Sequence, residues 1–388
     1  MIRHWRLPEG VDELLPPIAW QLELLRRQVL DVFRAWGFEY VDPPVIEYLD
    51  ALLVGTGTDM DLQTLKVVDQ KSGRMLGVRA DMTSQAARID AHSLPGGGVQ
   101  RLCYAGSVVH ANPAAALDSR VPLKAGAEIF GADTLSADAE VIALLVDVLR
   151  AAGVEAPVLV LGHMGIYQGL VEEMHLDGEE RAALFSAVQR KSETDITELL
   201  EARCGADRVA RLPTLMGRRQ VLREARAALA GAPPAVALAI DALERLADLV
   251  SARCPTVEVR FDVAELAGYG YHNGPVFSAY QNDRGSALAR GGRYDGIGAA
   301  FGRARPATGF DVSLKQLVTA TSEVSRAVWV PLAAPEGRRQ QSLQGALRRL
   351  RESGEIVVSA VSEAEQPPER CDRMLVEVDG VWTVRPLN

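Results

Sequence analysis

Glycine-rich segments and histidines are the first residues in this sequence that could carry chemistry. Residues 291–296 read Gly-Gly-Arg-Tyr-Asp-Gly, which matches neither a P-loop nor the G-x-G-x-x-G pattern of a nicotinamide fold. The sequence contains no G-x-S-x-G and no H-E-x-x-H pattern, and its six histidines are scattered without the spacing of metal ligands. We therefore expect no nicotinamide cofactor and no catalytic metal.

Four segments in a fixed order carry more information than any single motif. Together they resemble the catalytic core of histidyl-tRNA synthetase, a class II synthetase, over roughly residues 8–320. Their order and spacing carry the resemblance, because each segment alone is a weak signal. The segments are Arg79-Ala-Asp-Met-Thr83 with Arg88, residues 101–106 through 126–131, Tyr271-His-Asn-Gly-Pro-Val-Phe277, and residues 291–296 through Gly309-Phe310.

Three positions that are cationic in these synthetases have lost their arginine in this sequence. The resemblance places His110 at the arginine of motif 2, Gln316 at the arginine of motif 3, and Ala267 before the segment that begins at Tyr271. The acidic residue expected shortly after the first of these positions is Asn112. Adenylate formation needs cations on the triphosphate, so we predict that this protein does not make an aminoacyl-adenylate and has no catalytic residues.

The amino-acid end of the resemblance is better preserved. Asp81, Thr83 and Glu128 match positions that hold the α-ammonium of histidine in the family, and two carboxylates with a hydroxyl suit a cationic amine. Lys124 stands where glutamine is expected, and it could instead neutralise Glu128 and close the pocket. The resemblance thus implies a histidine-binding set formed by Asp81, Thr83, Lys124, Glu128, Tyr271 and His272.

A synthetase-like core without its phosphate-binding cations is similar to the ATP phosphoribosyltransferase regulatory subunit family. The match includes residues 7–12, Leu-Pro-Glu-Gly-Val-Asp, and residues 79–83. The resemblance implies a non-catalytic subunit that assembles with the short-form catalytic subunit, activates the first step of histidine biosynthesis and senses L-histidine. It also implies a homodimer within a hetero-oligomer. Two alternatives stay open: a divergent histidyl-tRNA synthetase, and a pseudo-synthetase that senses uncharged tRNA.

The elements that must position these residues begin with a helix and a hairpin. Apolar residues at helical spacing across residues 18–36, followed by Gly37, predict an amphipathic helix with a glycine stop. Alternation over residues 38–46 predicts a strand, and Pro43 and Pro44 place it at a sheet edge or an interface. Residues 65–79 predict an antiparallel hairpin around the turn at 71–74.

The remaining pattern predicts an interrupted core and a small terminal unit. Helical spacing over about residues 165–250 indicates an insertion, and strand patterns resume at 257–262 and 276–280. We predict an α+β fold of the class II synthetase type, with an antiparallel sheet flanked by helices, a helical insertion and a small C-terminal α/β unit. The predicted domains are 1–325 and 326–388.

Composition limits the remaining classes of function. The chain has 388 residues, is 48% hydrophobic and carries a net charge of −9, which opposes non-specific attraction to nucleic acid. No apolar run reaches the roughly 18 residues of a membrane-spanning helix, so we expect a cytoplasmic protein without membrane or nucleic-acid partners. The four cysteines lie far apart and contain no C-x-x-C pair, which favours reduced structural thiols.

Overall fold

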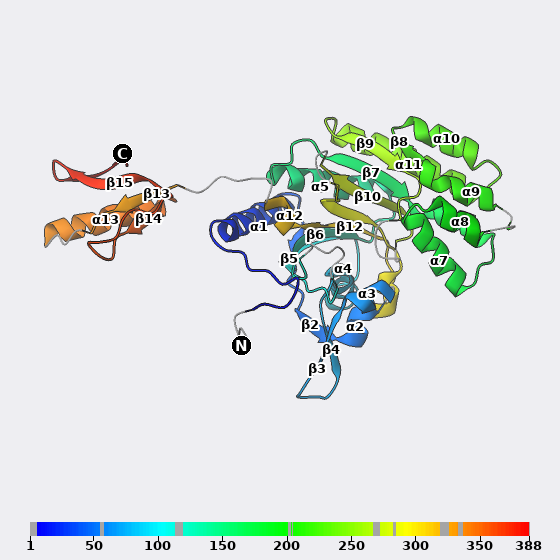
Figure 1. Ribbon diagram of the computed structural model, residues 1–388, viewed down its shortest axis with the longest axis horizontal. Helices are drawn as coiled ribbons and strands as arrows, with labels where there is room; N and C mark the ends of the chain where they lie inside the picture. The colour runs from blue at the N-terminus through cyan, green and yellow to red at the C-terminus, as the bar shows by residue number, and fades with distance from the viewer. Residues whose placement is uncertain are drawn as a thin grey trace. The chain divides into compact units, whose positions relative to one another are not determined.

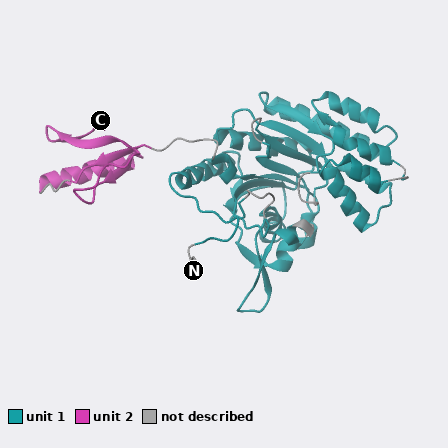
Figure 2. Ribbon diagram, viewed as in Figure 1, with its two compact units in different colours: residues 1–321 teal, residues 322–388 magenta. Residues whose placement is uncertain are grey.

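The computed structural model divides the chain into two compact units, residues 1–321 and 322–388 (Figure 2). The larger unit holds the candidate site, and each unit is described by itself below. The residues that the structure describes are 6–54, 58–112, 119–200, 203, 205–266, 272–281, 285–318, 326–332 and 337–387.

A nine-stranded sheet forms the centre of the larger unit within the described residues (Figure 1). Most neighbours are antiparallel, and the parallel pairs are β1 with β5 and β7 with β9. This arrangement confirms the predicted antiparallel sheet. In spatial order the strands are β1 (Glu39–Tyr40), β5 (Gln100–Ser107), β6 (Leu123–Phe130), β12 (Ala307–Ser313), β11 (Ala289–Arg293), β10 (Pro275–Tyr280), β7 (Val158–His163), β9 (Glu258–Asp262) and β8 (Met216–Gly217).

Long helices pack against one face of this sheet and enclose the main core. They are α1 (Ile18–Ala35), α5 (Leu135–Ala151), α11 (Pro234–Arg253) and the short α12 (Leu314–Val318). Alternate strand residues such as Leu159, Leu161 and Phe310 join this core. Because successive side chains of a strand point to opposite faces, the residues between them lie on the other face of the sheet. That opposite face carries the candidate site.

Helix α1 forms as the sequence predicts. Its buried residues Leu22, Leu25, Val29 and Phe33 recur at three- and four-residue intervals and therefore lie on one side of the helix. Gly37 follows with φ 78°, a left-handed conformation that glycine adopts without a steric penalty. The helix thus covers the sheet with one apolar stripe and then ends.

The segment after α1 differs from the single strand that alternation predicts over residues 38–46. It contains two short strands in different sheets, because β1 ends at Tyr40 and β2 (Ile46–Tyr48) pairs with β4. Pro43 and Pro44 lie between them and cannot donate a ladder hydrogen bond. The predicted hairpin is confirmed: β3 (Leu65–Val68) and β4 (Met75–Val78) are antiparallel, and β2 completes a three-stranded sheet.

Short helices surround this hairpin and lead into the candidate site. Helix α4 begins at Thr83, directly after the Arg79–Asp81 segment, and continues without a break into a π-helical turn. The helices are α2 (Leu49–Leu53), α3 (Thr58–Gln63), α4 (Thr83–Arg88) and η1 (Ile89–Ser93), and a 3-10 helix η3 (Ile297–Phe301) follows β11.

A group of helices occupies residues 164–253, as the helical spacing predicts. One feature was not predicted: the two-residue strand β8 interrupts the helices and pairs with β9 at the edge of the main sheet. The helices before α11 are α6 (Met164–Glu172), α7 (Gly178–Gln189), α8 (Glu193–Leu199), α9 (Ala206–Arg211), η2 (Leu212–Thr214) and α10 (Gln220–Ala228).

The smaller unit is a four-stranded sheet with one helix. The strand order is β14-β13-β15-β16, and α13 packs through Leu343 and Leu347 against Val328, Val330 and Leu375. The predicted small C-terminal α/β unit is confirmed. The elements are β13 (Ala327–Val330), α13 (Arg338–Glu352), β14 (Ile356–Ser359), β15 (Cys371–Val378) and β16 (Val381–Pro386). Among the described residues of both units, no helix has the length and apolar character needed to cross a membrane.

Candidate functional site

A buried carboxylate lies at the centre of the sheet face opposite the long helices. Glu128 on β6 is only 1% exposed. Its Oε1 accepts a hydrogen bond from the Tyr104 hydroxyl at 2.8 Å, and its Oε2 accepts one from the Tyr294 hydroxyl at 2.7 Å. The Tyr104 oxygen also lies 3.2 Å from Thr83 Oγ1. Residues from β5, β6, α4 and the end of β11 thus form one polar group inside the protein.

A glycine on the neighbouring strand makes room for this carboxylate. Gly309 on β12 is the register partner of Glu128, and a Cβ atom at Gly309 would collide with Glu128 Oε2 and backbone atoms of β6. The carboxylate therefore lies over the strand at a point where any larger residue would displace it.

Asp81 supplies a second buried carboxylate at the start of α4. The residue is 3% exposed, and its Oδ1 accepts hydrogen bonds from the backbone N–H groups of Met82 at 2.6 Å and Thr83 at 3.2 Å. These bonds fix the turn that leads into the helix. We call Asp81, Thr83, Tyr104, Glu128 and Tyr294 the carboxylate cluster.

Burial dominates the electrostatics of the carboxylate cluster. Loss of solvation raises the pKa of Glu128 to about 8, although hydrogen bonds from Tyr294 and Tyr104 act in the opposite direction. Burial also raises the pKa of Asp81, while the charge of Lys124 opposes the rise. The charge of Asp81 further raises the pKa of Glu128, and the charge of Asp311 acts in the same direction on Asp81. A cation placed between them would stabilise both ionised forms.

Lys124, one of the residues in the predicted histidine-binding set, forms its salt bridge across the sheet with Asp311. Its Nζ lies 2.8 Å from Asp311 Oδ1, with the side chains 13% and 22% exposed. Lys124 is the register partner of Ser313, and Asp311 is the register partner of Gly126, so the ion pair runs diagonally between β6 and β12. The carboxylate that pairs with Lys124 in this salt bridge is Asp311, whereas the sequence had suggested Glu128. The charge of Lys124 also lowers the pKa of Asp81.

The other end of the predicted set is only partly described. Tyr271 lies outside the described residues. His272 is 7% exposed, and its ring centroid lies 6.4 Å from that of Tyr294 in an edge-on arrangement. Tyr294 thus connects the His272 ring to the Glu128 carboxylate. The structure places Asp81, Thr83 and Glu128 in one cluster, with Lys124 and His272 at its borders.

Tyr104 and Tyr294 were not predicted as site residues. Both lie inside the segments that carried the resemblance, residues 101–106 and 291–296. Both rings are almost completely buried. A buried tyrosine hydroxyl normally requires a hydrogen-bond partner, so two tyrosines beside a buried glutamate were the available signal.

The positions that lost a cation carry different contacts. His110 Nε2 lies 3.1 Å from the carbonyl oxygen of Ala80. Asn112 donates a hydrogen bond to the Leu62 carbonyl oxygen at 3.3 Å. Gln316 lies on α12, and Ala267 lies outside the described residues. We call His110, Gln316 and Ala267 the former cation positions.

Two arginines of the segments that carry the resemblance are bound by the protein itself. The Arg79 guanidinium donates to the carbonyl oxygens of Ser107 at 2.9 Å and Pro43 at 2.5 Å, and the residue is 4% exposed. Arg293 pairs with the buried Asp138 at 2.8 Å. Their guanidinium groups satisfy buried acceptors and hold loops in place.

Comparison with known proteins places this geometry in a family. The family profile described as histidyl-tRNA synthetase matches residues 10–317, and the profile described as the ATP phosphoribosyltransferase subunit HisZ C-terminal domain matches residues 325–385. An ATP phosphoribosyltransferase regulatory subunit from Ectopseudomonas mendocina strain ymp is 49% identical, with 100% of this chain and 99% of the relative covered. The chain belongs to the ATP phosphoribosyltransferase regulatory subunit family. A regulatory subunit from Chromohalobacter salexigens is 46% identical over 99% of this chain and 98% of its own.

Solved structures support the same family and its fold. A protein from Bacillus halodurans C, described as an ATP phosphoribosyltransferase regulatory subunit/histidyl-tRNA synthetase, matches with TM-score 0.80 and 28% identity, covering 92% of each chain. Histidyl-tRNA synthetase from Nostoc sp. PCC 7120 matches with TM-score 0.76 and 16% identity, covering 93% of this chain and 87% of its own. The second likeness shows the fold alone. The predicted class II synthetase-like α+β fold of this regulatory subunit family member is confirmed.

Proposed function

We propose that the protein is a non-catalytic subunit that binds the short-form ATP phosphoribosyltransferase catalytic subunit and activates the first step of histidine biosynthesis in the cytoplasm. Family membership over the whole chain supports this proposal. The observation that carries it is the contrast within one site. The carboxylate cluster is fully built, while the former cation positions include a histidine and a glutamine.

We infer no catalytic role because the former cation positions lack full positive charges. Transfer of an amino acid to ATP places negative charge on the phosphates, and preorganised cations stabilise that charge in the transition state. His110 is only partly charged near neutral pH, and Gln316 is uncharged. Arg79 and Arg293 are already bound to buried groups of the protein. The described residues therefore favour ligand binding over adenylate chemistry.

L-histidine is the ligand that we infer for the carboxylate cluster. Asp81, Thr83 and Glu128 would receive the α-ammonium, because buried acceptors with elevated carboxyl pKa values gain most from a cation. His272 and Tyr271 would contact the ring of the ligand, and Lys124 would lie close to its charged end.

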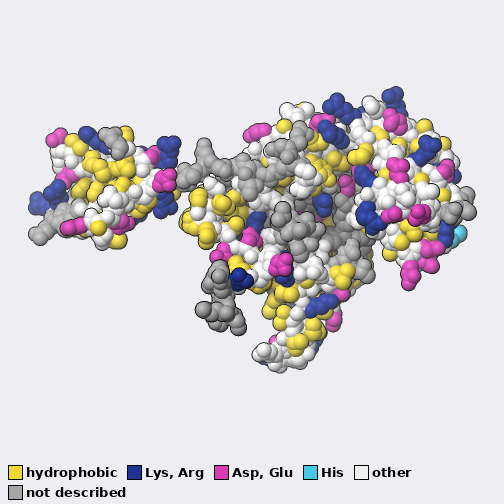
Figure 3. All heavy atoms as spheres, viewed as in Figure 1, with side chains coloured by type: hydrophobic (Ala, Val, Ile, Leu, Met, Phe, Trp, Pro, Cys, Tyr) yellow, Lys and Arg dark blue, Asp and Glu magenta, His cyan; other side chains and the backbone are white. Residues whose placement is uncertain are grey.

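A homodimer within the hetero-oligomer is the assembly that we infer. Apolar side chains gather over the three-stranded sheet (Figure 3), where exposed fractions reach 54% at Ile46 and 56% at Val68. Monomeric proteins rarely leave such a patch uncovered. Sedimentation at micromolar concentration should therefore show at least a dimer in the absence of partner. A monomer at that concentration contradicts this part of the proposal.

Co-purification tests the main proposal directly. The full chain, expressed with a tagged short-form catalytic subunit, should elute with it at a fixed ratio and raise its phosphoribosyltransferase rate. A long-form catalytic subunit serves as the matched control and should not retain the chain. Failure of the short-form subunit to retain or respond to the chain overturns the proposal, and a separate pyrophosphate-exchange assay tests the synthetase alternative.

A further inference from the structure

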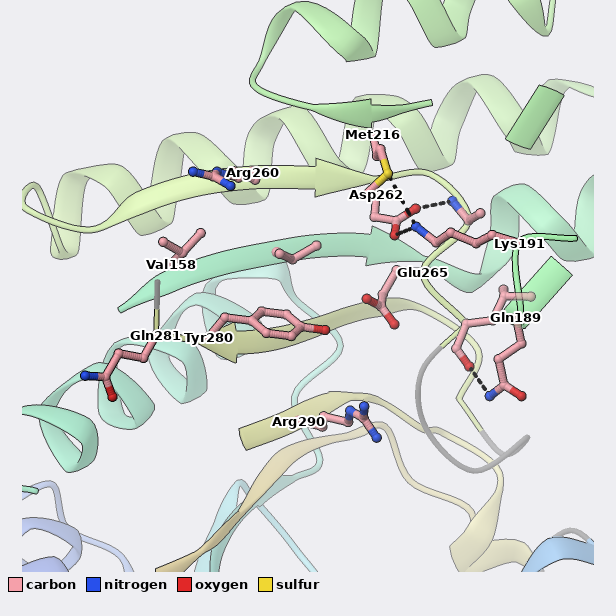
Figure 4. Close-up of a pocket in the computed structure, with 13 residues that line it drawn as sticks. Val158, Gln189, Lys191, Met216, Arg260, Asp262, Glu265, Tyr280, Gln281 and Arg290 are labelled. Carbon is pink, nitrogen blue, oxygen red and sulfur yellow. Dashed lines mark hydrogen bonds and ion pairs between the residues drawn. The ribbon is translucent and has the colours of Figure 1, made fainter. Parts of the chain in front are cut away.

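A cavity opens on the same sheet face as the carboxylate cluster, among described residues that the proposed histidine site does not use. It has a volume of about 610 Å³, within the usual range of about 300–1,000 Å³ for small-molecule sites. Strands β7, β9, β10 and β11 form its floor, and the end of α7 and β8 border it (Figure 4). Among the described residues, its lining shares none with the predicted histidine-binding set.

The floor of the cavity lies opposite the helical core. Val158 and Val160 line the cavity, whereas Leu159 and Leu161 of the same strand belong to the main core. The same alternation separates Tyr280 from Ala279 and Arg290 from Ala289 on the neighbouring strands. The cavity is therefore a built feature of the sheet face, with side chains directed into it by strand register.

Most of the charged groups that line the cavity are already paired. Lys191 forms an ion pair with Asp262, and Arg260 lies 3.1 Å from Glu258 Oε1. Arg290 differs from them. Among the described residues, no carboxylate oxygen lies within the 4.0 Å of an ion pair with its guanidinium, and the residue is exposed.

The position of Arg290 makes an unpaired cation unexpected. It lies on β11, an interior strand of the nine-stranded sheet, where β-branched and aromatic residues usually pack. Its register partners are Ser278 on β10 and Asp311 on β12, and Asp311 already pairs with Lys124. A guanidinium in this position has two parallel donors available for a carboxylate or phosphate group.

The lining also contains the Glu265 carboxylate and neutral polar groups. Gln281 Oε1 is buried, and within the described part of the chain it has no hydrogen-bond partner. Burying such an oxygen without a donor carries a free-energy cost, so a ligand hydroxyl would be favoured there. Burial raises the pKa of Tyr280, so its hydroxyl stays protonated and can donate a hydrogen bond. Figure 4 draws Tyr280 and Glu265 between Arg290 and the Lys191–Asp262 pair.

We propose that this cavity is a second ligand site for a small hydroxylated organic anion, with Arg290 binding the anionic group and Gln281 accepting a hydrogen bond from a ligand hydroxyl. The anionic group is a carboxylate or a phosphate. The site is separate from the carboxylate cluster, so the protein could bind this anion and L-histidine at the same time.

Calorimetry on the full chain tests the proposal with three probes that share a polyol skeleton. Ribose 5-phosphate carries a phosphate, gluconate carries a carboxylate, and ribose is uncharged. We expect at least one of the two anions to bind at least about tenfold more tightly than ribose. The preferred anion identifies the group that Arg290 binds. Equal binding of all three probes, or no binding, overturns the proposal.

Matched variants locate the binding. Arg290→Gln should weaken binding of the preferred anion at least about tenfold, and Gln281→Leu should weaken it by a smaller factor. Arg245→Gln removes an exposed arginine from α11, on the other face of the sheet, and should leave binding unchanged. Undiminished binding by Arg290→Gln overturns the proposal. Thermal unfolding of each variant checks that it folds.

Glu128→Gln separates this proposal from the histidine site. The variant should keep wild-type affinity for the preferred anion, because Glu128 does not line the cavity. Saturating L-histidine should likewise leave the anion bound. If L-histidine displaces the anion, or if Glu128→Gln abolishes its binding, then the two sites are one and the second site is rejected. Failure of L-histidine to bind leaves the anion result unaffected.

Discussion

The carboxylate cluster and the former cation positions lie in the same synthetase-like core. The cluster keeps the acidic residues that the resemblance predicts, whereas the former cation positions lack their arginines. At the carboxylate cluster, Glu128 receives two tyrosine hydroxyl groups and Gly309 leaves space for it. At the former cation positions, His110 contacts a backbone carbonyl group and Gln316 carries no charge. The carboxylates can therefore be kept while the cations are lost, because the two sets of side chains are attached to different elements.

Pyrophosphate exchange should show the largest consequence of this contrast. We expect histidine-dependent exchange into ATP to lie at least about 10²–10³-fold below that of an active histidyl-tRNA synthetase, since loss of a single preorganised electrostatic group costs this much. The measurement uses purified protein and the active synthetase as a positive control. Robust exchange that survives removal of contaminating synthetase would show that the former cation positions are dispensable.

Glu128→Gln tests the carboxylate cluster, the other member of this comparison. The substitution removes a buried charge that would pair with the ligand ammonium, worth about 1.5–3 kcal/mol, so affinity for L-histidine should fall about tenfold to a hundredfold. Glu198→Gln, an exposed change of the same type on α8, is the control and should retain wild-type affinity. Isothermal titration provides both values. Equal affinity of wild type and Glu128→Gln would place L-histidine elsewhere in the complex.

Gly309→Ala tests whether the space above β12 is needed. The added methyl group would displace the Glu128 carboxylate from its tyrosine partners, so we expect weaker L-histidine binding and a loss of about 1–3 kcal/mol in unfolding free energy. Gly296→Ala is the matched control, because its Cβ would meet no heavy atom within 4 Å. Chemical denaturation and titration of both variants decide the matter. Identical behaviour of the two variants would be inconsistent with the packing described here.

The pH dependence of stability tests the electrostatic environment of Glu128. The pKa of Glu128 is raised from 4.5 to about 8 in the folded protein, so the folded state retains a proton that the unfolded state releases between these values. This stabilisation is present below about pH 4.5 and is lost as pH rises through about 8. Relative to Glu128→Gln, the wild type should lose up to about 1.4 kcal/mol per pH unit within this range.

Denaturation of both proteins between pH 5 and pH 8 measures that difference. Subtraction of the two profiles removes the contribution of groups that do not interact with Glu128, and the difference includes the coupling between Glu128 and Asp81. Parallel profiles for the two proteins would mean that Glu128 has an ordinary pKa in the folded protein. The raised pKa described for Glu128 would then be wrong.

Local patterns determined much of this protein directly from its sequence. The apolar spacing of Leu22, Leu25, Val29 and Phe33 predicted α1, and the turn at residues 71–74 predicted the hairpin, because both depend on neighbours within a few residues. The replacement of cations by His110 and Gln316 was also visible without coordinates, since it depends only on residue identity within an ordered set of motifs.

Contacts between distant segments required the tertiary structure. Tyr294 and Glu128 are 166 residues apart, and Lys124 and Asp311 are 187 residues apart. Each pair meets because β6, β12 and β11 are adjacent in one register, which no local pattern specifies. The same register directs Arg290 into a cavity on the sheet face opposite the long helices. The sequence alone therefore identified which residue types were kept and lost, while strand pairing decided which of them face one another.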